Sequence, residues 1–526
     1  MCGIIAIFCR NKQEQIDLVT EAYNDVISKR GPDRGNLVIE ENYIIGFRRL
    51  CIVDTTELGD QPFVSGNIKM VCNGEIYNHK ELEKTYGLIC KSGSDCECII
   101  EIYKKIGFRN TINVLDGDFS VVIIDGNKMF FARDRIGVRP LFIGRTNNDN
   151  LAVASVARAL TGYCKWVEQL RPQITHYDGG IDRLFTYEHY YPSFISTGGT
   201  IYKYLQKTLI NSVQKRIMSD RPMCCMLSGG LDSSLVTSIL CKLIGPENVR
   251  TYSIGMTGSI DLKYAKIVAE YLGTQHTEVT FTPEEGFAAI PEIIRDIESY
   301  DITTIRASVG MWLLSKYISE NSNDVVVLSG EGSDELFMGY LYFHNAPNSL
   351  EANTESRRLV DELYLYDVLR ADRCISVHGL EPRVPFLDKD VINFALSLPG
   401  DSKIPVNGME KYTLRKSFET GFLPEQVLWR RKDGLSDGIS GSTKKWYEQI
   451  QDFVEDIISN DEFESVKNLF PNKEAYYYKK IYEDIFPPAY RPVVGYWLPK
   501  WTNHGGNPSG RIVSVYEEKT DLNVFK

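Results

Sequence analysis

The fold of the larger part of this chain follows from one segment, Met223-Cys-Cys-Met-Leu-Ser-Gly-Gly-Leu-Asp-Ser-Ser234. A short apolar run, Met223–Leu227, is followed by a turn rich in glycine and serine and then by an apolar, helix-like run. Similar strand-like runs recur further along the chain. Thr251–Ile254 precedes a helical pattern from Leu262, and Val325–Leu328 precedes a second loop. Strands that alternate with amphipathic helices predict a parallel, doubly wound sheet, an α/β fold.

The loop Ser228–Ser234 has the composition of a phosphate-binding turn. Its glycines, Gly229 and Gly230, let the backbone approach a phosphate, while serine hydroxyls and a helix N-terminus supply donors. It is not the common ATPase loop, because no Gly-Lys-Ser/Thr occurs in it. Asp232 suits such a cradle only if Mg²⁺ lies between its carboxylate and the phosphates. A serine-rich turn without a function is the alternative.

A second polar loop, Ser329-Gly-Glu-Gly-Ser-Asp-Glu335, follows the third of these strands. Loops at the carboxyl ends of parallel strands face one crevice in a doubly wound sheet. We therefore expect Asp334 to share the metal with Asp232. Lys432 is a candidate cation for a transition state at this crevice, and an ordinary solvated lysine is the alternative.

The N-terminal residues follow a different pattern, in which short strand-like runs are separated by turn residues. The runs are Gly3–Phe8, Tyr43–Phe47, Ile68–Cys72 and Phe119–Ile124. Two helical patterns interrupt them, near 15–28 and 96–106. Strands in two groups with helices outside predict a layered α+β sandwich.

A chain of 526 residues is too long for one core, so two or three domains are expected. The change of pattern predicts an N-terminal domain over 2–190 and a second domain over 200–526. The linker falls at Tyr191–Gly199, where Pro, Ser and Gly punctuate the chain. Residues 355–500 show a mostly helical pattern, and the last 25 residues predict a loose tail.

Cys2 directly follows the initiator Met1. If Met1 is removed, Cys2 carries a thiol and a free α-amine on one Cα, which together form a nucleophile–base pair. A thiol with a pKa near ~8.5 needs a base, and an α-amine with a pKa near ~7.7 is partly neutral at pH 7. The alternative is a cysteine without a role at this position.

Three polar clusters stand at predicted strand ends: Arg49–Asp54, Asn73–Asn78 and Gly93–Asp95. An amino-acid ligand needs a guanidinium for its α-carboxylate and a carboxylate for its α-ammonium. Arg49 and Asp95, with Glu75, can supply these groups. Asn73 and the Gly74 amide can donate to the oxyanion that forms when the cysteine attacks. Turn residues that cap strands are the alternative for any one of them.

Composition excludes several classes of protein. The net charge of -11 argues against a general nucleic-acid binder, because phosphate contacts need a basic face. No apolar window is long enough for a membrane helix, and no signal peptide is evident, so a cytoplasmic location is expected. Cys90, Cys96 and Cys98 do not have the spacing of a zinc site. The sequence leaves the oligomeric state open, a homodimer included.

The three clusters, with Cys2-Gly-Ile4 and Arg30-Gly-Pro-Asp33, resemble class II glutamine amidotransferases, in which an N-terminal cysteine hydrolyses glutamine. The resemblance implies an N-terminal-nucleophile domain with αββα layers. It implies Cys2 as nucleophile, its own amine as base, and Asn73 and Gly74 as the oxyanion hole. It also implies a glutamine site formed by Arg49, Leu50, Cys51, Ile52, Val53, Asn73, Gly74, Glu75 and Asp95.

The second domain resembles the ATP-pyrophosphatase domain of glutamine-hydrolysing asparagine synthetases. Besides the two loops, the resemblance covers Tyr300–Ser308, Gly339–His344 and Ser436–Gly438. It implies ATP contacts at Leu227, Ser228, Gly229, Gly230, Asp232, Ser233, Ser234, Ile254, Ser329 and Gly330. It implies a catalytic role for Glu331, beside the candidate Lys432, and places aspartate or pyrophosphate near Thr303, Thr304, Arg306, Asp334 and Arg383.

Together the two resemblances imply one reaction with glutamine, aspartate and ATP as substrates and Mg²⁺ as the metal. Asparagine, glutamate, AMP and diphosphate are the products, β-aspartyl-AMP is the intermediate, and ammonia crosses between the domains. One alternative is a related amidotransferase that adenylates another carboxylate. The other is a non-catalytic interaction protein that kept the fold, against which Cys2, Asp232, Glu331 and Lys432 speak together.

Overall fold

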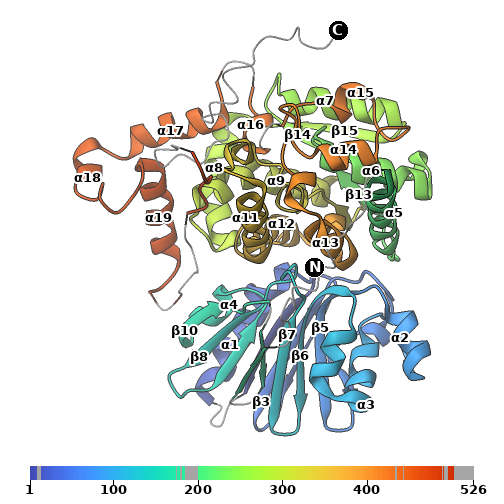
Figure 1. Ribbon diagram of the computed structural model, residues 1–526. Helices are drawn as coiled ribbons and strands as arrows, with labels where there is room; N and C mark the ends of the chain where they lie inside the picture. Colours follow the sequence, from blue (N-terminus) through green and yellow to red (C-terminus); the bar gives the residue numbers. More distant parts are fainter. Residues whose placement is uncertain are drawn as a thin grey trace.

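The computed structural model describes residues 1–8, 13–172, 174–177, 180–183, 199–432, 435–441, 444–488, 490 and 496–502. Two bodies lie one above the other: a strand-rich N-terminal domain and a larger, mainly helical domain around a parallel sheet (Figure 1). The predicted linker, except for Gly199, and nearly all of the predicted tail lie outside the described residues.

The described N-terminal domain contains two antiparallel sheets of six strands each. The first has the order β10-β8-β9-β1-β3-β2 and the second the order β12-β11-β7-β6-β5-β4. Their bounds are β1 Gly3–Phe8, β2 Arg34–Ile39, β3 Tyr43–Arg49, β4 Phe63–Ser65, β5 Ile68–Ile76, β6 Gly117–Asp125, β7 Lys128–Arg133, β8 Phe142–Thr146, β9 Leu151–Ala154, β10 Cys164–Gln169, β11 Ile174–Tyr177 and β12 Gly180–Arg183.

Alternation along β1 explains why its sequence is apolar throughout. Ile4 and Ala6 belong to the core between the sheets, whereas Ile5 and Ile7 belong to the core on the other face. That outer face packs under α1 (Gln13–Asp25) and α4 (Arg158–Thr161). The other sheet packs against α3 (Glu97–Val114), beside α2 (His79–Tyr86). The predicted αββα layering is confirmed.

The second domain is organised around five described parallel strands in the order β15-β14-β13-β16-β17. They are β13 Met223–Met226, β14 Arg250–Gly255, β15 Gln275–Thr280, β16 Val326–Leu328 and β17 Glu381–Arg383. The strand order reverses between β13 and β16. Such a switch point leaves a crevice at the carboxyl ends of the strands, which is where ligands bind in sheets of this kind. The predicted doubly wound sheet is confirmed.

Helices surround this sheet and continue into the predicted helical extension (Figure 1). The helices of the sheet region are α5 Gly199–Lys215, α6 Leu231–Ile244, α7 Ile260–Leu272, α8 Pro283–Ile297, α9 Ile302–Asn321 and α10 Ser333–Leu336. The extension contains α11 Ser349–Glu362, α12 Asp367–Ser376, α13 Lys389–Ser397, α14 Tyr412–Ser417, α15 Glu425–Leu428, α16 Leu435–Gly438, α17 Trp446–Ile457, α18 Asn460–Glu464 and α19 Lys473–Ile485.

Buried polar contacts hold the two domains together. Arg30 forms a two-pronged ion pair with Asp372 on α12, at 2.8 and 3.0 Å. Both side chains are almost completely buried. The amino nitrogen of Met1 donates to the Leu380 carbonyl, 2.9 Å away. The N-terminus therefore lies at the domain contact, as Figure 1 shows.

Candidate active sites

Cys2 lies directly before β1, at the end of its domain that faces the other domain (Figure 1). Its Sγ is 3.4 Å from the Leu50 nitrogen and 3.5 Å from the Leu50 oxygen. Its carbonyl accepts a hydrogen bond from Arg30 Nε at 3.0 Å. Burial raises the pKa of the Cys2 thiol to about 12. While Met1 is attached, this thiol is therefore protonated and unreactive at neutral pH.

Met1 is itself fully buried beside Cys2. Burial lowers the pKa of its amino group to about 5. The α-nitrogen of Cys2 is tied up in the Met1–Cys2 peptide bond and cannot take a proton. Removal of Met1 would free that nitrogen as an amine and vacate a buried space next to the thiol.

Asn73 and Gly74 lie in the middle of β5, in the sheet that faces β1. Both amide atoms of the Asn73 side chain are buried, and neither has a hydrogen-bond partner among the described residues. A buried amide without partners costs about 1–3 kcal/mol, which favours a ligand at this position. Gly74 has φ +150°, and a Cβ there would lie 2.0 Å from the Asp118 oxygen, so only glycine fits.

The predicted glutamine-binding charges already have protein partners. Arg49 donates to Asp60 Oδ1 at 2.6 Å and to the Thr56 carbonyl at 2.8 Å. Asp95 accepts from the Ile76 nitrogen at 2.6 Å, and burial raises its pKa. A ligand carboxylate at Arg49 would thus share the guanidinium with Asp60. The buried carboxyl of Asp95 would gain from a ligand ammonium, which favours its charged form.

The predicted binding loop Leu50–Val53 follows β3, and its residues Leu50, Cys51 and Ile52 are buried. The Cys51 nitrogen donates to Asp33 Oδ2 at 2.8 Å. The Ile52 carbonyl accepts from the Asp220 nitrogen of the second domain at 2.9 Å. This loop is therefore held between Cys2 and the domain contact.

Arg383 corrects the sequence prediction. The resemblance implied a place beside aspartate or pyrophosphate, but its buried side chain lies at the domain contact, where Nη1 donates to the Arg216 carbonyl at 2.7 Å and Nη2 is 3.4 Å from Glu75. Its Nε also donates to Glu381 at 2.9 Å. Only its backbone reaches the crevice, where its carbonyl accepts from the Ser329 nitrogen at 2.9 Å. On a strand the side chain and the ladder bonds point in different directions, which separates the two contacts.

Glu381 brings a charge of the second domain into the cysteine site. The negative charge of its carboxylate raises the pKa of Cys2, of Glu75 and of Asp95, in each case in addition to burial. Arg139 and Arg383 hold the pKa of Glu381 itself below its usual value, although burial opposes this. The pKa values of these three groups in the first site thus depend in part on a residue that the other domain supplies.

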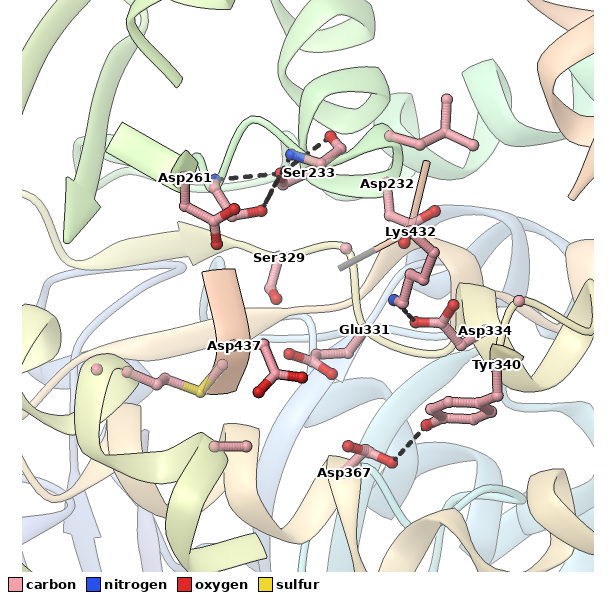
Figure 2. A pocket seen from close by; sticks show the side chains of 18 of the residues that line it. Asp232, Ser233, Asp261, Ser329, Glu331, Asp334, Tyr340, Asp367, Lys432 and Asp437 are labelled. Atoms are coloured by element: carbon pink, nitrogen blue, oxygen red, sulfur yellow. Dashed lines mark hydrogen bonds and ion pairs between the residues drawn. The ribbon is translucent and has the colours of Figure 1, made fainter. Parts of the chain in front are cut away.

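At the switch point, the two polar loops open into one cavity of about 280 Å³ (Figure 2). The predicted ATP contacts that line it are Leu227, Ser228, Gly230, Asp232, Ser233, Ile254, Ser329 and Gly330. Gly229 and Ser234 are not among the described lining residues. Gly229 has φ +69°, and a Cβ there would lie 2.4 Å from the Ala265 nitrogen, so this glycine serves close packing of the loop on α7. The Ser234 side chain is buried within α6.

Two carboxylates and two lysines form the charged wall of the cavity. Lys411 Nζ lies between Asp232 Oδ2, at 2.6 Å, and Asp334 Oδ1, at 2.7 Å. Lys432 Nζ is 2.6 Å from Asp334 Oδ2 (Figure 2). Burial opposes ionisation of Asp334, but the two ammonium groups hold its pKa well below the usual range. Lys432 is therefore in the predicted place, whereas Lys411 was not predicted.

The carboxylates of Asp232 and Asp334 fit a magnesium site. Mg²⁺ prefers oxygen ligands and is commonly bound by one or two carboxylates together with substrate phosphates. The two side chains stand in the first turns of α6 and α10, directly after the loops that follow the neighbouring strands β13 and β16. The ammonium of Lys411 holds the position between them, so a metal there requires this lysine to move.

Glu331 projects into the cavity between Ser329 and Asp367 (Figure 2). Its Oε2 accepts from Arg370 Nη2 at 2.7 Å. Burial raises the pKa of Glu331, and the Arg370 guanidinium opposes the rise. Arg370 belongs to α12, the same helix that pairs with Arg30 at the domain contact.

The predicted aspartate residues other than Arg383 all line the cavity, namely Thr303, Thr304, Arg306 and Asp334. Thr303, Thr304 and Arg306 stand in the first turns of α9. Arg306 is buried, and its Nε donates to Glu474 Oε1 on α19 at 2.8 Å. Its charge is thus already balanced inside the protein, so Arg306 is better suited to hold α19 than to bind a free carboxylate.

Comparison with known proteins agrees with both sites. Residues 1–190 match the family model of the glutamine amidotransferase domain, and residues 204–363 and 350–491 match that of asparagine synthase. The glutamine-hydrolyzing asparagine synthetase of Mesocricetus auratus is 40% identical over 563 residues, covering 98% of this chain and 99% of that protein. Its Homo sapiens counterpart is 40% identical over 566 residues with the same coverage. This chain belongs to the asparagine synthase family.

Family membership confirms the resemblance of both domains that the sequence showed. Among solved structures, the glutamine phosphoribosylpyrophosphate amidotransferase from B. subtilis, complexed with ADP and GMP, matches with a TM-score of 0.30 at 20% identity. The match covers 46% of this chain and 64% of that chain. Within the described residues, no helix has the length and apolar character that a membrane span needs.

Proposed function

We propose that this protein synthesises asparagine from aspartate, ATP and glutamine, releasing AMP, diphosphate and glutamate. The 40% identity to glutamine-hydrolyzing asparagine synthetases over 98% of the chain supports this. The observation that carries it is the cavity at the switch point. It combines the Ser228–Ser233 loop, Glu331 and Lys432, which stand far apart in the sequence.

The first half-reaction takes place at Cys2, once Met1 has been removed. The α-amine accepts the thiol proton, and the thiolate attacks the amide carbon of glutamine. The Asn73 amide and the Gly74 nitrogen donate to the oxyanion. Ammonia leaves with the transferred proton, and water then cleaves the thioester to give glutamate.

Recognition of glutamine uses opposite charges at its α-carbon. Arg49 binds the α-carboxylate, while Asp95 and Glu75 bind the α-ammonium. The backbone of Leu50–Val53 borders the same space, since it contacts Cys2 on one side and the second domain on the other.

The second half-reaction takes place in the cavity. A β-carboxylate oxygen of aspartate attacks the α-phosphorus of ATP, and the bond from that phosphorus to the leaving diphosphate breaks. The loop Ser228–Ser233 donates to the diphosphate, and Lys432 balances its charge. Asp232 and Asp334 would hold Mg²⁺ together with phosphate oxygens, and the ion would supply further neutralisation of the phosphates.

Ammonia from the first site then attacks the acyl carbon of β-aspartyl-AMP, with Glu331 beside the reacting group, and AMP leaves. We propose that ammonia passes between the domains without release to solvent. The position of Cys2 at the domain contact supports this, since Arg30 donates to its carbonyl and pairs with Asp372 of the second domain. A cytoplasmic location, a homodimer and the lack of a nucleic-acid partner stay part of this proposal.

The test is a product analysis with aspartate labelled with ¹⁸O in its β-carboxylate. Attack on the α-phosphorus should give AMP and diphosphate in equal amounts with asparagine, and the label should appear in AMP. Phosphorylation instead of adenylation would give ADP and phosphate as the main products and would contradict the proposal. Absence of asparagine with aspartate as the acceptor would favour a different carboxylate substrate.

A further inference from the structure

A C-terminal segment far from the sheet in sequence contributes to the wall of the synthetase cavity. We call residues 496–502 the strap. Trp497 and Pro499 of the strap line the cavity, and Trp497 is only 9% exposed. Residues 496–500 belong to the stretch with the predicted mostly helical pattern, but the strap forms neither a helix nor a strand, so its place at the cavity was not predicted.

The backbone of Trp497 is bonded on both sides to the start of α9. Its nitrogen donates to Asp301 Oδ1 at 2.7 Å, and its carbonyl accepts from Thr303 Oγ1 at 3.2 Å. The other oxygen of Asp301 caps α9 by accepting from the Thr304 nitrogen and hydroxyl, at 2.8 and 2.7 Å. One buried carboxylate thus ties the strap to the turn that carries Thr303 and Thr304.

The ring of Trp497 packs at the side of the cavity away from the phosphate loop. Its centroid is 5.1 Å from that of Tyr340 and 6.1 Å from that of Tyr342. Tyr340 donates to Asp367 at 3.2 Å, and Figure 2 shows this pair across the cavity from Ser233. The strap therefore borders the part of the cavity that remains for the acceptor once ATP phosphates occupy the Ser228–Ser233 loop.

Further contacts fix the strap from outside the cavity. The ring of Trp501 lies 6.0 Å from Tyr342 and 6.1 Å from Phe343. Lys500 Nζ is 3.5 Å from Glu355 Oε2 on α11. The strap is thus packed as part of the domain and adds two tryptophans to a core cluster.

We propose that the strap positions the amino-acid acceptor: Trp497 closes the acceptor end of the cavity and, through Asp301, fixes Thr303 and Thr304 toward the acceptor. Trp497 is a positioning residue in this proposal. The inference rests on the proposed function in one respect, that the acceptor is aspartate. A small dicarboxylic amino acid matches an end of the cavity that offers hydroxyls and buried carboxylates beside aromatic rings.

The first experiment measures the KM for aspartate of the Trp497→Ala variant and of the unmodified protein, with ammonium as the nitrogen source. The KM for aspartate should rise by about tenfold or more, because the aromatic wall is lost and the backbone bonds to Asp301 and Thr303 lose the ring packing that holds the strap in place. The KM for ATP and the glutaminase rate should stay within about twofold, since neither site contacts the strap. Trp497→Phe keeps a ring against Tyr340 and Tyr342, which Trp497→Ala lacks, so it should restore most of the aspartate affinity.

Two controls separate positioning from general damage. Trp312→Ala removes a tryptophan from α9, where it packs on His378 and is not among the described lining residues of the cavity, and should leave the KM for aspartate unchanged. A chain ending at Thr502 should behave as the full chain, whereas one ending at Tyr496 should resemble Trp497→Ala. If Trp497→Ala does not fold, Asp301→Asn tests the same link, because one amide oxygen cannot serve both sets of donors.

Failure of this inference differs from failure of the proposed function. An unmodified protein that makes no asparagine from aspartate would overturn the proposed function and, with it, the acceptor role of the strap. A functional protein whose Trp497→Ala and Asp301→Asn variants keep the KM for aspartate would overturn the strap alone. Equal losses in the aspartate KM, the ATP KM and the glutaminase rate would also overturn it, as they indicate a merely structural role.

Discussion

In the first domain, the residues around Cys2 depend on groups from the second domain, whereas the described lining of the switch-point cavity belongs entirely to the second domain. Leu380, Glu381 and Arg383 reach Met1, Cys2 and Glu75 across the contact. Among the described residues that line the cavity, none comes from the first domain. The comparison teaches that the cysteine site is incomplete without its partner domain, while the synthetase cavity is built by its own fold.

The largest effect is expected from removal of the nucleophile. Cys2→Ala should lower glutamine-dependent asparagine synthesis by a factor of at least about 10³, because nothing else can form the thioester. Synthesis from ammonium should remain near that of the unmodified protein. Measurement of asparagine with each nitrogen source checks this.

A variant that retains a residue before Cys2 is a second form of the same test. Its α-nitrogen stays in a peptide bond, so it should lose glutamine-dependent synthesis to a similar degree. Undiminished use of glutamine by either variant would show that Cys2 is not the nucleophile.

A substitution in the synthetase cavity should have the opposite effect, with loss of synthesis but not of glutamine hydrolysis. Glu331→Ala should block synthesis with both nitrogen sources, since the proposed role of its carboxylate is at the acyl-adenylate. Arg370 would lose Glu331 but keep its second carboxylate partner, Asp367, so the fold should be kept. Glutaminase activity of the same sample should persist and shows that the protein is folded. Loss of glutaminase together with synthesis would mean that the two sites are not as separate as the structure indicates.

The Asp95→Asn variant tests how the first site binds the ammonium group of glutamine. The Asn oxygen can still accept from the Ile76 nitrogen, so the fold is kept, but the charge for the glutamine ammonium is gone. The KM for glutamine should rise on the order of a hundredfold, since an unpaired buried charge costs several kcal/mol. Asp125→Asn, whose carboxylate binds the Tyr103 hydroxyl at the end of β6, is the matched control and should not change this KM.

Much of the fold was predictable because it is local. The apolar runs of β1 and β5 and the strand–loop–helix pattern at Ser228–Ser234 each follow from neighbouring residues. The order of the parallel strands then brings Asp232 and Asp334 to one crevice, as expected. Site residues at strand ends were predicted for this reason.

The parts that were missed depend on contacts across long stretches of chain. Lys411 meets Asp232 from 179 positions away, and no local pattern marks it. Arg383 was misplaced because its strand is three residues long and contains a proline, so the sequence did not show which way its side chain points. Trp497 reaches the cavity only through tertiary packing.

The dependence of the first site on the second domain is tested most directly by Arg383→Met. With Glu75 left without its guanidinium partner, glutamine-dependent synthesis should fall by about tenfold or more, while ammonium-dependent synthesis stays within about twofold. Arg250→Met, which removes an ion pair with Asp324 elsewhere in the same sheet, should not favour one nitrogen source over the other. A rise in the aspartate KM with glutamine use intact would contradict the account and return Arg383 to the synthetase cavity.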